Sequence, residues 1–100
     1  MVKFHVESVE YGDEVFFVRS APAIAMIDLL EKQKDLDDMK FNFALVAASL
    51  CNKNGTNGVD TSVEEIGSWP WSLVAELIKA ATSVNGFAEI VEAVEGSKKN

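Results

Sequence analysis

The sequence predicts a mostly helical α+β domain, in which an N-terminal β-hairpin packs on a small bundle of three to five helices. Apolar and polar residues alternate over residues 2–7, and a β-branched and aromatic run follows at 15–18, a pattern typical of two half-buried strands. Later stretches repeat apolar residues at helical spacing. A chain of 100 residues supports one domain, which we expect over residues 1–95, with 96–100 as a frayed tail.

The composition is that of a soluble globular protein with an acidic balance. Apolar residues make up 48% of the chain, too many for a disordered protein. The formal net charge is −7, and Arg19 is the only arginine. Because phosphate backbones are bound by clustered Lys and Arg, nucleic-acid binding is disfavoured, and so are anionic membrane surfaces. With a single cysteine and no basic-then-apolar leader pattern, we expect a cytoplasmic protein.

The hairpin is expected over residues 2–19, with its turn at residues 11–14, where Gly12 suits a positive φ. A first helix should run from about Ala21 to Lys34, with Ser20 as its N-cap and Pro22 in its first turn. Its expected apolar stripe consists of Ile24, Ile27 and Leu30, with Ala23 and Met26 beside them.

The least polar stretch, Met39 to Cys51, predicts a core helix around which the other elements pack. Asp37 or Asp38 is its expected N-cap, and Asn52 with Gly55 its expected end. The stretch is shorter than the roughly 18 apolar residues that indicate a membrane span. Two faces follow from helical spacing, a stripe of Met39, Phe43, Val46, Ala47 and Leu50 and a small-residue face of Ala44, Ala48 and Cys51.

The polar segment 52–60 contains two glycines and predicts a tight reversal. It is not a calcium loop, because Asn57 and Val63 occupy the positions that the loop glycine and the closing glutamate would need. Ser62 and Glu65 have the spacing of a capping box, which should open a short helix that stops at Gly67.

Ser68 is the expected N-cap of a longer helix that Asn85-Gly86 ends. Its apolar band should be Leu73, Val74, Leu77, Ile78 and Ala81. Phe87 can pack back on the last turn, and residues 88–95 should add a short amphipathic segment that uses Ile90, Val91 and Val94.

The sequence offers little for catalysis. His5, the only histidine, is interpreted as an exposed strand residue, and Cys51 as a buried, inert thiol. The acids at Asp35, Asp37 and Asp38 are interpreted as a solvated helix start. We therefore expect no enzyme, no cofactor and no metal site.

Aromatic residues are the better candidates for a functional surface. Trp69 and Trp71 flank Pro70 and point in different directions, so we expect one ring in the core and the other exposed. Phe16 and Phe17 are adjacent in a strand and must face opposite sides. Exposed aromatic rings often mark partner surfaces, although two half-buried tryptophans remain an alternative. The candidate partner-binding residues are Phe16, Trp69, Trp71 and Phe87.

Four short patterns follow one another in this chain: a strand ending in Val15-Phe16-Phe17-Val18-Arg19, the apolar run and turn over residues 45–55, Ser62-Val63-Glu64-Glu65-Ile66-Gly67, and Ser83-Val84-Asn85-Gly86-Phe87. In this order they resemble the tail assembly chaperones of long-tailed, lambda-like siphophages. The resemblance covers most of the chain, from about residue 15 to residue 87.

The resemblance implies a non-structural factor of phage or prophage tail morphogenesis that acts in the host cytoplasm. It implies that the chain binds the tape measure protein, keeps it soluble and helps recruit tail tube protein subunits, by reversible masking of apolar surface. The alternative is a small acidic regulator or inhibitor of a basic protein partner, which the charge of −7 suggests. Self-association is left open.

Overall fold

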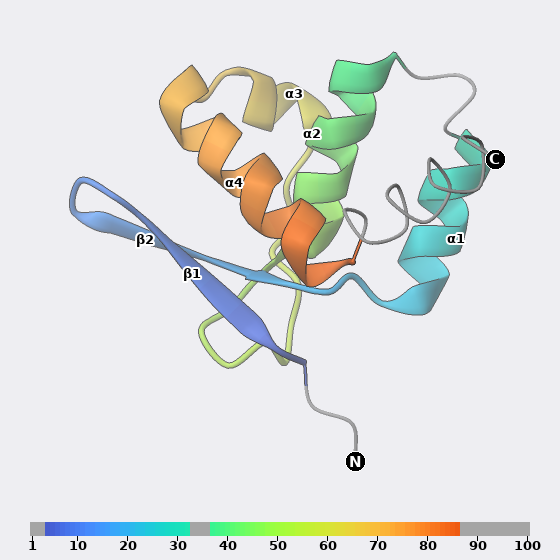
Figure 1. Cartoon of the computed structure of the whole chain (residues 1–100), viewed down its shortest axis with the longest axis horizontal. Coiled ribbons are helices and arrows are strands. Elements are labelled where there is room, and N and C mark those ends of the chain that lie inside the picture. The colour runs from blue at the N-terminus through green and yellow to red at the C-terminus, as the bar shows by residue number, and fades with distance from the viewer. Residues whose placement is uncertain (1–3, 33–36, 87–100) are drawn as a thin grey trace, which may run out of the picture.

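The computed structural model describes residues 4–32 and 37–86, which form a three-stranded antiparallel sheet packed with four helices (Figure 1). The predicted α+β class with its N-terminal hairpin is confirmed. The sheet has the order β1-β2-β3. The elements are β1 (Val6–Tyr11), β2 (Glu14–Arg19), α1 (Ala23–Lys32), α2 (Asp38–Ser49), β3 (Leu50–Cys51), α3 (Val63–Gly67) and α4 (Trp71–Val84).

Strand β2 is the central strand, and its two faces are covered by different parts of the chain. Val18 is fully buried in the helix-side core, and Phe16, which shares its face, packs against that core. Arg19 faces the other way, where its Nη1 donates to the Gly55 carbonyl at 2.7 Å and its guanidinium lies 4.5 Å from the centre of the Phe4 ring. Helices therefore cover one face of β2, and the loop after β3 covers the other.

Helix α2 contacts the other three helices and β2, so the expectation that it lies at the centre of the bundle is confirmed. Asp37 is its N-cap, as predicted, with Oδ1 accepting from the Lys40 amide at 2.7 Å. Figure 1 shows α2 and α4 together on one side of the hairpin. The buried core consists of Val18, Leu29, Leu45, Val46, Leu50, Ile66, Leu73, Val74, Leu77, Ala80 and Ala81.

The predicted end of this helix is wrong. It stops at Ser49, and Leu50 adopts an extended backbone (φ −64°, ψ 137°) that starts β3. Leu50 and Cys51 then pair with Val18 and Phe17 of β2, and both side chains are buried. The pairing gives the backbone hydrogen-bond partners and keeps the apolar side chains covered. Met39, predicted on the buried stripe, is 43% exposed near the other end of α2.

The predicted stripe of α1 is also wrong. Ile24, Ile27 and Leu30 are exposed, whereas Leu29 is buried and Met26 packs against the core. Helix α1 has apolar residues on two sides, and it turns the Met26–Leu29 side toward the core. It begins at Ala23, which places Ser20 too far upstream to be its N-cap.

Asn85 joins three elements through its side chain. Its Oδ1 accepts from the Ala21 amide at 2.8 Å, and its Nδ2 donates to Ser49 Oγ at 2.9 Å and to the Ala81 carbonyl at 2.7 Å. Ser49 is fully buried at the end of α2, so its hydroxyl needs such a partner. The start of α1 and the ends of α2 and α4 are therefore held together by one amide.

The boundary between α3 and α4 differs from the prediction at one position. Ser62 caps α3 as expected, accepting from the Glu65 amide at 3.1 Å. Ser68, however, ends α3 and donates its hydroxyl to the Glu65 carbonyl at 2.6 Å, so it does not cap α4. Helix α4 begins at Trp71, because Pro70 keeps the residue before it out of the helical region.

The predicted apolar band and end of α4 are confirmed. Leu73, Val74, Leu77 and Ala81 are buried, and Ile78 packs partly against the core. Gly86, with φ 72°, follows the C-cap Asn85. Phe87, the segment 88–95 and the tail 96–100 lie outside the described residues.

The reversal predicted over residues 52–60 is present as a loop that closes on β3. The Asn52 amide donates to the Asn57 carbonyl at 3.0 Å, and the Asn52 Oδ1 accepts from the Thr56 amide at 2.9 Å. Gly55 lies buried in this loop with φ 72°, and a Cβ there would come within 2.5 Å of Val6 Cγ2. The loop can approach β1 closely only because this residue is glycine.

Gly55→Ala should lower the free energy of unfolding by about 3 kcal/mol, because the alanine is strained at positive φ and also displaces Val6. Gly12→Ala is the matched control: φ is 61° there, but no atom lies within 4 Å of the added Cβ, so we expect a loss of about 1 kcal/mol. Urea unfolding measures both. Equal losses would contradict the close packing of the loop on β1.

Candidate functional site

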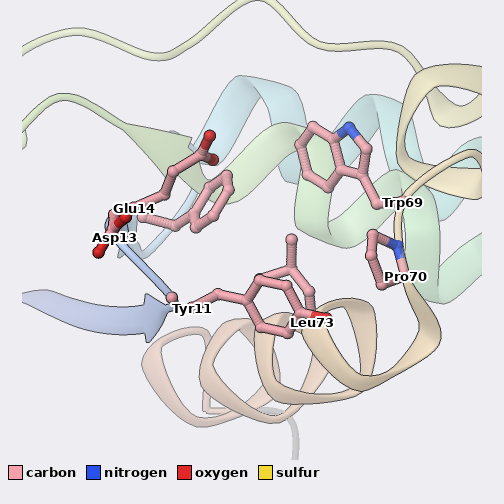
Figure 2. Close-up of a pocket in the computed structure, with 8 residues that line it drawn as sticks. Tyr11, Asp13, Glu14, Trp69, Pro70 and Leu73 are labelled. Atoms are coloured by element: carbon pink, nitrogen blue, oxygen red, sulfur yellow. The ribbon is translucent and has the colours of Figure 1, made fainter.

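An open pocket of about 580 Å³ lies between the hairpin turn and the α3–α4 connection (Figure 2). We call it the aromatic pocket. It is lined by Tyr11, Gly12, Asp13, Glu14, Phe16, Trp69, Pro70 and Leu73. Two of the predicted partner-binding residues, Phe16 and Trp69, therefore meet in one place although they lie far apart in the sequence.

Phe16 and Trp69 form a tilted ring pair, with centroids 5.6 Å apart and planes at 48°. Both rings are half-buried and pack against the core. The backbone holds Trp69 in place, because its amide donates to the Ile66 carbonyl at 3.0 Å and Pro70 follows it directly. The rings are thus presented in a fixed arrangement at the edge of the core.

Tyr11 connects the two walls of the pocket. Its hydroxyl lies 3.0 Å from Ser72 Oγ, which links the tip of the hairpin to the first turn of α4. Figure 2 shows the Tyr11 ring beside Leu73, on the opposite side of the pocket from Trp69. A two-stranded hairpin alone is only marginally stable, so this contact helps to fix the width of the pocket.

The rim of the pocket is acidic. Asp13 and Glu14 lie in and next to the hairpin turn, both are exposed, and they are the only charged side chains among the described residues that line the pocket. The floor is apolar, formed by Phe16, Trp69 and Leu73. An apolar floor with a negative rim favours a ligand that carries apolar groups next to positive charge.

Apolar surface continues beyond the aromatic pocket on the side of β3. A smaller pocket of about 210 Å³ shares Phe16 and Trp69 and also touches Val15 and Val59, which are both exposed. The Phe16–Trp69 pair therefore lies between two pockets. A partner segment that contributes more than one side chain could contact both pockets.

The expectation of one packed and one exposed tryptophan is confirmed. Trp69 packs against the core, whereas Trp71, the first residue of α4, is 61% exposed. Trp71 lies one residue after Pro70 and does not line the aromatic pocket. Phe87, the fourth predicted partner-binding residue, lies outside the described residues.

The sequence did not identify Tyr11 as a site residue. The sequence pattern around Tyr11 indicates only a turn, because the contact with Ser72 joins positions 61 residues apart. Helical spacing predicts Leu73 as a core residue, and in the structure it also forms part of the pocket floor. The spacing Trp-Pro-Trp was the signal that pointed to this region.

The residues that are candidates for catalysis or metal binding in the sequence do not form a common site among the described residues. The His5 side chain is exposed, as predicted, with Nε2 3.8 Å from Glu7 Oε1. The residue itself lies just before β1, so the prediction that it is part of a strand is wrong. Over residues 4–32 and 37–86, no three His, Cys, Asp or Glu side chains are grouped so that they could hold a metal ion. Asp35 lies outside these ranges. Within the same ranges, each helix is too short or too polar to cross a membrane.

Cys51 is buried, as predicted, beneath the loop that Arg19 holds. Burial raises the pKa of its thiol, and the nearby Arg19 guanidinium only partly opposes this effect. The thiolate is the nucleophilic form. A thiol with a raised pKa and little access to solvent is therefore a poor nucleophile at neutral pH.

The raised pKa of Cys51 makes a pH-dependent contribution to stability. Below the pKa of cysteine in the unfolded chain, about 8.5, this contribution is fully present. Above it the unfolded chain ionises first, so the contribution is lost as the pH rises through the folded pKa. The free energy of unfolding of the wild type relative to Cys51→Ala should therefore fall between about pH 7 and pH 10 in urea titrations. A constant difference would contradict this account.

No protein-family model, curated protein or solved structure matches this chain.

Proposed function

We propose that this chain is a tail assembly chaperone of a phage or prophage that acts in the host cytoplasm. It binds the tape measure protein by covering apolar surface, keeps it soluble and helps recruit tail tube subunits. The observation that carries this proposal is the open aromatic pocket, with the Phe16–Trp69 pair at its floor and Trp71 exposed close by. The order of sequence features that resembles this chaperone family supports the choice of partner.

Large aromatic rings at the surface suit the binding of another polypeptide. Tryptophan and tyrosine are enriched among the residues that dominate binding energy at interfaces, where truncating one commonly costs about 2 kcal/mol or more. Trp71 is exposed, and Trp69 and Phe16 are open on their pocket side. The surface can therefore bind an apolar segment through a few contacts.

The shape and charge of the pocket indicate the kind of segment that it would bind. An amphipathic helix places its apolar face into such a groove and leaves its polar face in water. Asp13 and Glu14 at the rim favour a helix that carries Lys or Arg beside its apolar stripe. We therefore propose that the chain recognises helical parts of the tape measure protein where apolar and basic residues adjoin.

The proposed mechanism needs no chemical step. The Tyr11–Ser72 contact and the fixed backbone around Pro70 hold the pocket in shape before a partner arrives. A preorganised surface loses little conformational entropy on binding. The complex can then form and dissociate as the tail assembles, which reversible masking requires.

Co-expression tests the proposal directly. An insoluble tape measure fragment should become soluble and co-purify with the wild-type chain. Trp71→Ser should weaken this binding about tenfold or more, because the exposed ring is lost without disturbing the core. Met39→Ser is the matched control, since Met39 is also an exposed apolar residue but lies outside both pockets of the Phe16–Trp69 pair. Titration calorimetry with a soluble fragment measures both affinities.

Failure of the wild-type chain to solubilise or bind any tape measure fragment would overturn the proposal, as would equal effects of the two substitutions. Replacing both Asp13 and Glu14 with Lys tests the rim, and we expect weaker binding of basic segments. Binding to an unrelated basic protein that weakens steeply with salt would instead favour the acidic regulator.

A further inference from the structure

Three aromatic rings line the aromatic pocket, and no lysine or arginine among the described residues lines it with them. The rings are those of Tyr11, Phe16 and Trp69. The face of an aromatic ring attracts cations, and tryptophan does so most strongly. On the other face of β2, the Arg19 guanidinium already lies 4.5 Å from the centre of the Phe4 ring. The pocket offers the same kind of surface to a cation from outside.

Two carboxylates stand at the hairpin end of these rings. Figure 2 shows Asp13 and Glu14 there, across the pocket from Pro70. Both side chains are exposed, and over residues 4–32 and 37–86 neither forms a salt bridge. Their charge is therefore available to a ligand that reaches the rim.

The rings are held in place before a ligand arrives. The Tyr11 hydroxyl is already paired with Ser72 Oγ at 3.0 Å, so Tyr11 presents its ring to a ligand rather than its hydroxyl. The Phe16 and Trp69 rings, with centroids 5.6 Å apart, contact each other and leave no room between them. A ligand therefore rests against this pair, with Tyr11 on the opposite side of the pocket from Trp69.

An apolar floor with an acidic rim suits a side chain that is itself amphipathic. Arginine lays its methylene groups on apolar surface and carries its charge at the tip. Its guanidinium is planar, stacks on aromatic rings and is more weakly hydrated than the ammonium of lysine. Its five N–H donors can serve both carboxylates. An aliphatic side chain would fill the floor but would leave Asp13 and Glu14 partly desolvated without a partner.

We propose that the aromatic pocket binds an arginine side chain of the partner polypeptide. The guanidinium rests against the Phe16–Trp69 pair and Tyr11 and donates to the two rim carboxylates, while the methylene groups cover Leu73. An exposed salt bridge alone contributes little, so the rings give the pocket its selectivity. The inference rests on the proposed function for the identity of the partner, and it makes one arginine the anchor of the segment that the chain recognises.

Two small probes test this pocket without a tape measure fragment. Nα-acetyl-arginine amide carries the guanidinium, and Nα-acetyl-citrulline amide replaces it with a neutral urea of nearly the same shape. The arginine probe should shift the Trp69 indole N–H signal and the amide signals of residues 11–16 saturably, in the millimolar range. The citrulline probe should bind about fivefold or more weakly. Equal binding of the two probes would overturn the proposal.

Paired substitutions locate the site. Asp13→Asn combined with Glu14→Gln removes both rim charges with little change in shape, and should weaken binding of the arginine probe about fivefold or more while leaving the citrulline probe unaffected. Glu64→Gln combined with Glu76→Gln is the matched control, since both acids are exposed and lie outside the pocket. We expect no change in the control. Equal losses in the two variants would mean that the probe responds only to net charge, which would overturn the proposal.

A second pair of variants tests the Tyr11 ring. Tyr11→Leu removes the ring and should weaken binding of the arginine probe about threefold. Ser72→Ala removes the same hydrogen bond but keeps the ring, so its loss should be smaller. Equal losses would overturn the role of the ring.

The outcome is separable from that of the proposed function. If a tape measure fragment binds but the arginine probe does not, only the arginine pocket is overturned. If the probe binds in the pocket but no fragment does, the proposed function is overturned and the arginine pocket stands. Nα-acetyl-lysine amide that binds as tightly as the arginine probe would overturn the choice of arginine.

Discussion

The pairing and burial of the second half of strand β2, where Val18 and Arg19 are both buried, is the constraint on which the fold depends. There β1 pairs on one edge and β3 pairs with Phe17 and Val18 on the other. Val18 lies under the helices, and Arg19 lies under the loop that holds Gly55. Arg19 at its end is buried against that loop, where the Gly55 carbonyl and the Phe4 ring replace part of its hydration. A strand enclosed in this way cannot slip by one residue, because Val18 and Arg19 would exchange faces.

The candidate site is a consequence of this arrangement. Phe16 is directed toward the helices by the same alternation that buries Val18, but it lies nearer the open end of the hairpin, where the bundle no longer covers it. Pro70 lies between α3 and α4 and prevents them from forming one continuous helix. The Trp69 ring, just before this proline, packs against the Phe16 ring. The pocket is therefore built by the scaffold itself. The buried Arg19 guanidinium lies on the other face of β2, where Nη1 donates to the Gly55 carbonyl and Nε has no hydrogen-bond partner among the described residues.

Local signals in the sequence predicted much of the fold. The turn glycine at position 12, the Ser62 cap and the Asn85-Gly86 stop each act over a few residues, and each is found where expected. The sequence did not reveal the features that depend on tertiary packing. Leu50 and Cys51 continue an apolar helical pattern, but β2 offers them ladder partners; α1 has two apolar sides, and the sequence could not tell which one meets the core. In the site, Phe16 and Trp69 were predicted, whereas Tyr11 was missed because its partner Ser72 is distant in the chain.

We propose that a partner polypeptide binds at the Phe16–Trp69 pair and the neighbouring Trp71. The indole N–H signals of Trp69 and Trp71 in a proton–nitrogen spectrum report on this surface directly. Titration with a soluble tape measure fragment should shift both indole signals, together with the backbone amides of residues 11–16, and leave α1 unchanged. Saturable binding that moves other signals while both indoles stay in place would contradict the account.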